Sequence, residues 1–264
     1  MRWHGRALMP ASRKDALMPG PAPLDTLIPA WLAARSVARG LPLPVADRGG
    51  YRVDSGLDTE IRRWVFPYVC DGLKELGREI NAPFLPLKLC GDGAALMACL
   101  PDRWQLEPPT WFMRGGGVMT APALPSGYRA ETMRQGATVY VQINTTSGDV
   151  AASGYAAYYG ATNQGAKNQG PVFVYDRIIT APAHQRKGLG RVVMARLQAE
   201  KPEAGWTELL VATSEGRALY ERLGWTLLSP YSTALIPAET VAEREAGTEA
   251  GARICPPHNK RDSV

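Results

Sequence analysis

Residues 172–225 constrain the fold of this chain more than any other stretch. They begin with VFVYDRIIT at 172–180, an almost continuously apolar run that is typical of a strand at the centre of a sheet. A short turn of basic residues and glycines follows, and residues 188–200 then have the pattern of an amphipathic helix. The pattern goes on to predict a strand, a short helix and a strand at 207–212, 215–223 and 225–236. This alternation is typical of α/β and α+β folds, in which helices flank a mixed central sheet.

The turn within this segment is Gln185-Arg186-Lys187-Gly188-Leu189-Gly190. Because it ends where a helix begins, its backbone N–H groups lack partners within the helix and can bind an anion. Its two glycines let the backbone come close to a ligand, and Arg186 and Lys187 add positive charge. The turn therefore predicts a pyrophosphate-binding site. A glycine-rich turn without a ligand is the alternative.

Two common nucleotide-binding patterns do not fit this turn. Val193 stands where a dinucleotide-binding fingerprint has its third glycine. The Gly-Lys-Ser/Thr sequence of a P-loop does not occur in the chain. What remains is Gln-x-x-Gly-x-Gly, placed directly between a buried strand and an amphipathic helix.

This pattern and a second one resemble a known family. HQRKGLGRVVMARL at 184–197 resembles the acyl-CoA signature of the GNAT superfamily of N-acetyltransferases, Arg/Gln-x-x-Gly-x-Gly/Ala. ATSEGRALYERLGW at 212–225 resembles the family's second signature, a short helix that ends in Leu-Tyr-x-x-Leu-Gly-Phe/Trp. The resemblance covers about residues 128–237. It implies a GNAT-like fold, acetyl-CoA as the cosubstrate without a metal, and transfer of the acetyl group to a primary amine by direct attack on the thioester.

The resemblance also implies which residues form the site. Those implied in binding acetyl-CoA are Ile178, Ile179, Thr180, Gln185, Arg186, Lys187, Gly188, Leu189, Gly190, Arg191 and Ser214. Tyr220 takes the position of the general acid that protonates the leaving thiolate, a role that suits a phenol with a pKa near 10. A packed aromatic side chain on an amphipathic helix is the alternative for Tyr220.

A general base is harder to place. Asp176 lies in the apolar strand that leads into the turn, where a charge calls for a reason and where family members often carry a base. Pairing with Arg177, or exposure near the end of the strand, is the alternative for Asp176. His184 is interpreted as a loop residue beside the turn, and Tyr175 as a candidate for the acceptor side.

The chain divides around Gly115-Gly116-Gly117, the most prominent linker signal. The predicted parts are a disordered tail at 1–24, an N-terminal α/β region at 25–115, a linker at 116–127, an acetyl-CoA-binding domain at 128–237 and a flexible tail at 238–264. The N-terminal region is expected to begin with a helix capped by Asp25 and ended by Gly40. Few residues separate the strands at 128–133 and 137–144, where the family has two helices that shape the acceptor pocket. We therefore expect residues 51–114 to be a degenerate, cofactor-free half of similar fold that builds this pocket.

The net charge and the cysteines indicate which binding partners and which cellular compartment to expect. The net charge is +5, but residues 1–20 hold more than half of it, and no basic run elsewhere is interleaved with aromatic residues, so nucleic acid is not an expected partner. No apolar run approaches the roughly 20 residues that span a membrane. The four cysteines form no CxxC pair and suggest free thiols in the cytoplasm. A small-molecule amine is the expected partner, while a homodimer and a non-catalytic acyl-CoA-binding module remain open.

Overall fold

The computed structural model describes residues 23–120, 122–160 and 170–238. The predicted tails fall almost entirely outside the described residues, as does most of the loop at 160–170. The helices in this part of the chain include α1 (Leu24–Arg39), α2 (Asp71–Glu79), α3 (Gly93–Met97), α4 (Leu189–Ala199) and α5 (Ser214–Arg222). The strands are β1 (Val45–Asp47), β2 (Gly50–Leu57), β3 (Glu60–Phe66), β4 (Leu87–Cys90), β5 (Gln105–Leu106), β6 (Thr110–Arg114), β7 (Tyr128–Gln135), β8 (Thr138–Thr145), β9 (Val150–Tyr159), β10 (Val172–Thr180), β11 (Thr207–Ala212) and β12 (Thr226–Leu235).

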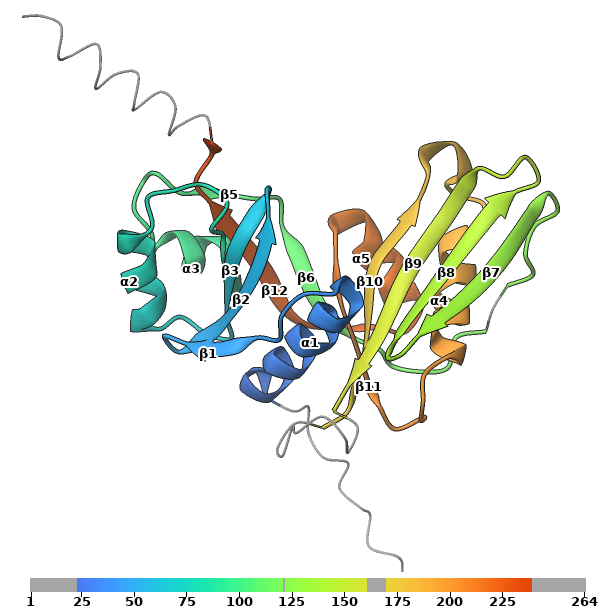
Figure 1. Ribbon diagram of the computed structural model, residues 1–264, viewed down its shortest axis with the longest axis horizontal. Helices are drawn as coiled ribbons and strands as arrows, with labels where there is room; N and C mark the ends of the chain where they lie inside the picture. The colour runs from blue at the N-terminus through green and yellow to red at the C-terminus, as the bar shows by residue number, and fades with distance from the viewer. Residues whose placement is uncertain (1–22, 121, 161–169, 239–264) are drawn as a thin grey trace, which may run out of the picture.

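These strands form one continuous mixed sheet. The strand order is β1-β2-β3-β4-β12-β6-β11-β10-β9-β8-β7, and β5 pairs with β12 beside this path. Figure 1 shows α2 and α3 beside the first half of the sheet, and α4 and α5 beside the second. The predicted mixed sheet flanked by helices is therefore confirmed.

The two halves of the sheet repeat one topology. In the first half, β1, β2 and β3 form an antiparallel meander, and β3 then pairs in parallel with β4 across the connecting helix α2. In the second half, β8, β9 and β10 form the same meander, and β10 pairs in parallel with β11 across α4. A short helix follows each parallel pair, α3 in the first half and α5 in the second. This order agrees with the expectation that the first region is a related half.

The last strand of each half lies in the other half. β6 ends the first region of the chain but pairs with β11, whereas β12 ends the second region and pairs with β4. The two strands also pair with each other at the centre of the sheet (Figure 1). The boundary predicted at residues 116–127 therefore does not separate two independent packing units. Local patterns predict the strands, but which strands pair across the chain depends on contacts that are distant in sequence.

Helix α1 joins the two halves on one face of the sheet. Its apolar side chains Ile28, Trp31 and Leu32 are buried in a core with Val172 and Val174 of β10. The helix ends at Gly40 as predicted, because that residue has a φ of 62°. The predicted cap was wrong: Pro23 is the N-cap residue and Asp25 lies in the first turn.

Helix α4 covers the opposite face of the second half. It packs on β8, β9 and β10 in a second core that includes Val193, Leu197 and Phe173. Gly154 of β9 makes this approach close, because a Cβ there would lie 2.5 Å from Ile178 Cδ1 and 2.8 Å from Val193 Cγ1.

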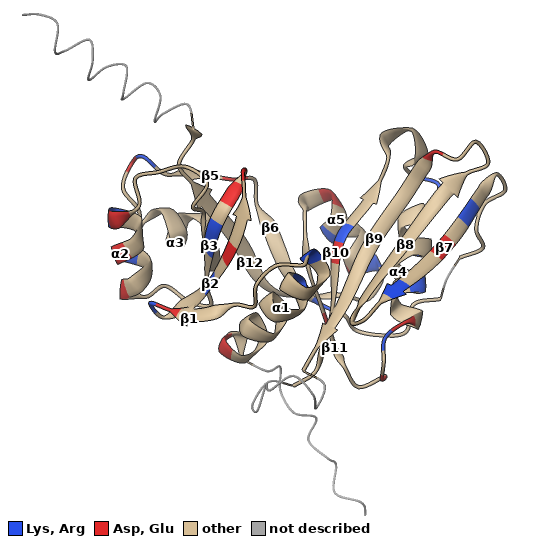
Figure 2. Ribbon diagram, viewed as in Figure 1, with Lys and Arg blue, Asp and Glu red and all other residues tan. Residues whose placement is uncertain are grey.

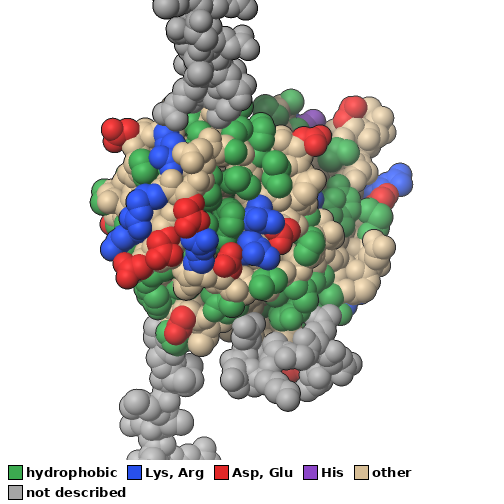
Figure 3. Space-filling view, turned by 60° about the vertical axis from the view of Figure 1, so that its left-hand side comes forward, with side chains coloured by type: hydrophobic (Ala, Val, Ile, Leu, Met, Phe, Trp, Pro, Cys, Tyr) green, Lys and Arg blue, Asp and Glu red, His purple; other side chains and the backbone are tan. Residues whose placement is uncertain are grey.

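The first half carries charges of both signs on its outer strands. Arg52 pairs with Asp47 and Asp54, and Arg62 also pairs with Asp54. Figure 3 shows basic and acidic side chains interleaved on the face that it brings forward. The acidic residues here are thus paired with arginines. None of the helices that the structure describes is long and apolar enough to cross a membrane.

Candidate active site

The site begins where β10 and β11 separate. The two strands pair only from Val172 to Val174 and from Thr207 to Leu209. Beyond Val174, β10 continues to Thr180 and is paired with β9 alone. A bulge interrupts that pairing between Asp176 and Ile179, and Arg177 has a φ of 54°. The edge of β10 that faces β11 is therefore open near the carboxyl ends of both strands, where sheets of this kind bind ligands.

A cavity of about 330 Å³ lies at this separation. The lining side chains that bear on chemistry are Trp31, Arg35 and Arg39 of α1, Thr110 of β6, Tyr175, Asp176 and Arg177 of β10, and Thr213 and Tyr220 at α5. Of residues 51–114, which were expected to build the acceptor pocket, the lining includes Thr110. The structure corrects that expectation, because α1 lines the cavity with Trp31, Arg35 and Arg39, whereas residues 51–114 contribute Thr110. Nothing in the local sequence of α1 indicates this placement, since it depends on packing against strands far along the chain.

The predicted pyrophosphate turn is an open loop at the start of α4. A 3-10 turn at Pro182–His184 precedes it, and Arg186, Lys187 and Gly188 are exposed. In the described part of the chain, the backbone N–H groups of residues 186–190 have no backbone acceptor, whereas those of Arg191 and Val192 bond to Gly188 O. These donors at a helix N-terminus favour an anion.

The two glycines of the turn have different explanations. Gly188 caps α4 with a φ of 79°, a conformation that glycine adopts without strain. Gly190 has no such conformation, and a Cβ there would make only ordinary contacts, 3.6 Å from Thr180 Oγ1 and 4.0 Å from Leu219 Cδ2. The fold itself therefore does not require glycine at position 190. A ligand that approaches the N-terminus of α4 closely would explain it.

Basic and aromatic side chains lie beside the turn. Lys187 Nζ donates to Tyr128 OH at 3.1 Å, and Tyr128 OH is 2.9 Å from His184 Nδ1. His184 thus flanks the turn and contacts Tyr128 of β7, as its interpretation as a loop residue implies. Leu189 is buried beneath the first turn of α4, and Arg191 is exposed. Gln185 Nε2 lies 3.5 Å from Thr180 O.

The remaining residues implied in acetyl-CoA binding lie on β10 and at the start of α5. Ile178 lines the cavity, whereas the side chain of Ile179 is 58% exposed. Ser214 is the exposed first residue of α5, and Thr213 before it both caps that helix and lines the cavity. Thr213 Oγ1 accepts from Gly216 N at 3.3 Å. The sequence analysis assigns Thr213 no role, although a threonine just before a predicted helix is an N-cap signal.

Tyr220 lies on the wall of the cavity, on the buried side of α5. Its side chain is 7% exposed and packs beside Trp225, with a distance of 5.8 Å between the ring centroids. Burial raises the pKa of Tyr220 to about 12. The phenol is therefore protonated at neutral pH and can donate a proton into the cavity. Tyr175 also lines the cavity, but its hydroxyl donates to Glu208.

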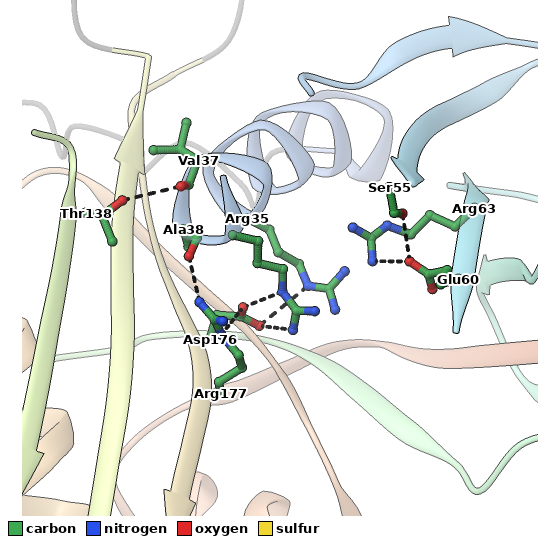
Figure 4. A network of polar contacts seen from close by, with 10 residues as sticks. Arg35, Val37, Ala38, Ser55, Glu60, Arg63, Thr138, Asp176 and Arg177 are labelled. Carbon is green, nitrogen blue, oxygen red and sulfur yellow. Dashed lines mark hydrogen bonds and ion pairs between the residues drawn. The ribbon is translucent and has the colours of Figure 1, made fainter. Parts of the chain in front are cut away.

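Asp176 is surrounded by arginines. Arg39 donates to both of its carboxylate oxygens, and Arg35 Nε and Arg177 Nε lie 3.5 and 3.4 Å from it (Figure 4). Figure 2 shows basic residues where α1 ends against β10. Burial acts to raise the pKa of Asp176, but the hydrogen bonds from Arg39 and the nearby positive charges outweigh it and hold the pKa below its ordinary value.

These surroundings argue against Asp176 as the general base. A carboxylate with a lowered pKa and an occupied set of acceptor sites has little tendency to take a proton. The pairing with Arg177 that the sequence offered as the alternative is present, and two arginines of α1 join it. Asp176 instead ties α1 to β10.

A second cavity lies at the other end of β11. It has a volume of about 910 Å³ and is lined by the Gly115–Gly117 linker, the end of α4 and Glu208. Although it is the larger cavity, it lies away from the turn and from Tyr220. Gln198, Lys201 and Tyr175 all donate to the buried carboxylate of Glu208. This carboxylate is thus a structural tie. Within the described residues, no group of His, Cys, Asp and Glu is arranged to hold a metal, and Cys70, Cys90 and Cys99 are free.

Comparisons with known proteins bear on this geometry. Residues 135–227 match a family model described as "Acetyltransferase (GNAT) domain". The resemblance to the GNAT superfamily is confirmed. The matched range includes β10, β11, the turn between β10 and α4, and Tyr220.

Solved structures extend the likeness beyond this domain. A GCN5-related N-acetyltransferase from Kribbella flavida is 15% identical with a TM-score of 0.52, and the alignment covers 80% of this chain and 98% of that chain. A GCN5-related N-acetyltransferase-like protein from Streptococcus suis is 12% identical with a TM-score of 0.47, covering 72% of this chain and 84% of that one. No curated protein matches the sequence. The first likeness shows a shared fold that extends well into the first half of the sheet.

Proposed function

We propose that this protein transfers an acetyl group from acetyl-CoA to a primary amine. One observation carries the proposal: the open edge of β10 leads from the unpaired N-terminus of α4, where a Cβ on Gly190 would lie 3.6 Å from Thr180 Oγ1, to the cavity that Tyr220 lines. The open edge and the helix N-terminus suit an elongated ligand with a pyrophosphate at one end. Tyr220 suits a reaction at the other end of that ligand. The match of residues 135–227 to a GNAT domain supports the same conclusion.

The residues present fit acetyl-CoA. The N–H groups of residues 186–190 and the basic side chains of Arg186 and Lys187 would hold the pyrophosphate. The edge of β10 beyond Val174 would bond the amide groups of the pantetheine arm, as a sheet edge bonds an added strand. The absence of a side chain at Gly190 leaves room for the ligand at the helix end.

The reaction needs a proton at the leaving sulfur and the loss of a proton from the amine nitrogen. Acetyl-CoA supplies a thioester whose carbonyl carbon accepts an amine nitrogen as its carbon–sulfur bond breaks. Tyr220 would donate its phenolic proton to the departing sulfur, since the phenol lines the cavity and is protonated at neutral pH. A backbone N–H on the open edge of β10 would donate to the carbonyl oxygen.

The attacking amine must lose a proton before or during attack. Asp176 is committed to Arg39 and its neighbours, so we assign this step to a chain of water molecules that leads out of the cavity. Tyr220 would recover its proton along the same route.

A thiol-release screen tests the proposal. The full chain is mixed with acetyl-CoA and a library of amines, and free thiol is measured. Gly190→Ala serves as the cofactor-binding variant, since its methyl group fits the fold but not a ligand at the helix end. Gly205→Ala is the matched control, because a Cβ at that position meets nothing within 4 Å. The proposal predicts release that depends on an amine, is lost in Gly190→Ala and persists in Gly205→Ala. CoA binding without release by any amine would instead indicate a non-catalytic acyl-CoA-binding module.

A further inference from the structure

Arg35 is the least satisfied charged group of the cavity. It extends from α1, and its side chain is 17% exposed. Its guanidinium lies 5.6 Å from the centre of the Trp31 ring, and its Nε is 3.5 Å from Asp176 Oδ1, too long for a strong hydrogen bond. Its Nη1 is buried without a hydrogen-bond partner among the described residues. A buried donor without a partner destabilises the folded protein, so this arrangement calls for an explanation.

The other two arginines of the cavity are occupied. Arg39 donates to Asp176 Oδ2 at 2.6 Å and to Oδ1 at 2.9 Å. Arg177 donates to Ala38 O at 2.6 Å, and its guanidinium stacks 3.8 Å from the centre of the Tyr155 ring. Figure 4 shows the polar contacts around Asp176 and the hydrogen bond from Arg177 to Ala38. Arg35 therefore differs from its neighbours: it lines the cavity, and among the described residues it has the Asp176 carboxylate and the Trp31 ring beside it but no close hydrogen bond.

The surroundings of Arg35 carry an excess of positive charge. Three guanidinium groups and one carboxylate, that of Asp176, line the cavity. Behind Arg35, both Arg63 and Lys88 pair with the single carboxylate of Glu60. The pKa of Lys88 is lowered to about 8, first by burial and then by repulsion from Arg35 and Arg63, against the attraction of Glu60. An added anion would relieve this repulsion, and in a low-dielectric cavity its effect would be large.

We propose that Arg35 binds an anionic group, a carboxylate or a phosphate, on the acceptor amine. The planar guanidinium offers two parallel donors that match either group. Because Arg35 and Tyr220 line the same small cavity, a short molecule with an amine at one end and an anion at the other would span it. The acceptor class is thus an amino acid or an amine that carries a phosphate. This inference rests on the proposed acetyl transfer and names its substrate class.

The test combines binding and turnover. Binding is measured by calorimetry on the CoA-saturated full chain with β-alanine, phosphoethanolamine, propylamine and ethylenediamine. These probes share a short amine and differ in the charge at the other end, and the first two separate a carboxylate from a phosphate. A broader thiol-release panel then compares amino acids and phosphate-bearing amines with their neutral and cationic analogues.

Arg35→Gln is the test variant and Arg35→Lys retains the charge. Asp176 keeps both bonds from Arg39 in either variant, and thermal unfolding checks the fold. Arg129→Gln is the control, because it removes a charge from a side chain that is 80% exposed on β7. We expect anionic amines to bind and react best, at least about tenfold weaker binding and a raised KM in Arg35→Gln, partial recovery in Arg35→Lys and no change in Arg129→Gln.

Two results would overturn the inference while leaving acetyl transfer intact: preferred turnover of neutral or cationic amines, or anionic amines that react equally well with Arg35→Gln. Failure of every anionic amine to bind the CoA-saturated protein would also overturn it. If the protein binds no CoA at all, the proposed function itself fails, and this outcome is distinct from the others.

Discussion

Arg39 of α1 holds both carboxylate oxygens of Asp176 of β10, with Nε 2.6 Å from Oδ2 and Nη2 2.9 Å from Oδ1. The two residues are 137 positions apart in the sequence. Their pairing fixes α1 against the strand that borders the candidate site. It also argues against Asp176 as a base, while Arg35, one helical turn away, lines the cavity.

Replacing Asp176 with Asn should destabilise the protein. The substitution leaves the partly buried Arg39 and Arg35 without their counter-charge, which should cost less than the roughly 3–5 kcal/mol of a fully buried pair but more than the up to about 1 kcal/mol of an exposed one. Urea unfolding of the wild type and the variant measures this difference in the free energy of unfolding. A variant that keeps its stability but loses turnover would show that Asp176 acts in catalysis after all.

The same pair predicts how stability depends on pH. The pKa of Asp176 in the folded chain lies below its ordinary value of 3.8, so its stabilising effect is complete above that pH. As the pH falls through the lower, folded-state pKa, the carboxylate takes a proton and the stabilisation is lost. Denaturant unfolding at a series of acidic pH values should show a steeper loss for the wild type than for Asp176→Asn. Parallel curves would contradict this origin of acid sensitivity.

Replacing Tyr220 with Phe should lower kcat without lowering stability much. The ring still packs beside Trp225, but the proton for the leaving sulfur is gone, which costs about a hundredfold or more when a general acid is removed. KM for acetyl-CoA should change little, since the turn at α4 is untouched. Steady-state kinetics measures both parameters, and wild-type kcat in Tyr220→Phe would leave Tyr220 as a packed aromatic residue only.

Replacing Gly154 with Ala should destabilise the second half of the sheet. The new Cβ would lie 2.5 Å from Ile178 Cδ1 and 2.8 Å from Val193 Cγ1, so these side chains, or the elements that carry them, have to shift. Overpacking of this kind costs about 1–3 kcal/mol. Thermal unfolding of Gly154→Ala, with Gly205→Ala as the control, checks the packing of α4 on β9. Equal melting temperatures for the two variants would contradict it.

The sequence predicts the second half of the fold well because its signals are local. The apolar run of β10, the glycine turn and the spacing of α4 are each encoded within a few neighbouring residues, and the predicted range of β10 matches the structure. The pair of family signatures then places Tyr220 relative to the turn. In the proposal, these parts of the site bind acetyl-CoA and protonate its leaving sulfur.

The acceptor side was not predictable in the same way. Trp31, Arg35 and Arg39 come from a helix that looks like any amphipathic helix, and they reach the cavity only because α1 packs on β10. The exchange of β6 and β12 between the halves is likewise set by pairing over long sequence distances. The charge of Asp176 within an apolar strand is visible in the sequence, but no local pattern indicates its arginine partners on α1.

The most direct test of the central claim is calorimetric titration of CoA into the wild type, Gly190→Ala and Gly205→Ala. The account places the pyrophosphate at the N-terminus of α4, where an added methyl group has room within the fold but not beside a ligand. It predicts binding to the wild type and Gly205→Ala, and an affinity at least about tenfold weaker, or about 1.4 kcal/mol, for Gly190→Ala. Equal affinity of all three proteins for CoA, or no binding to the wild type, would contradict it.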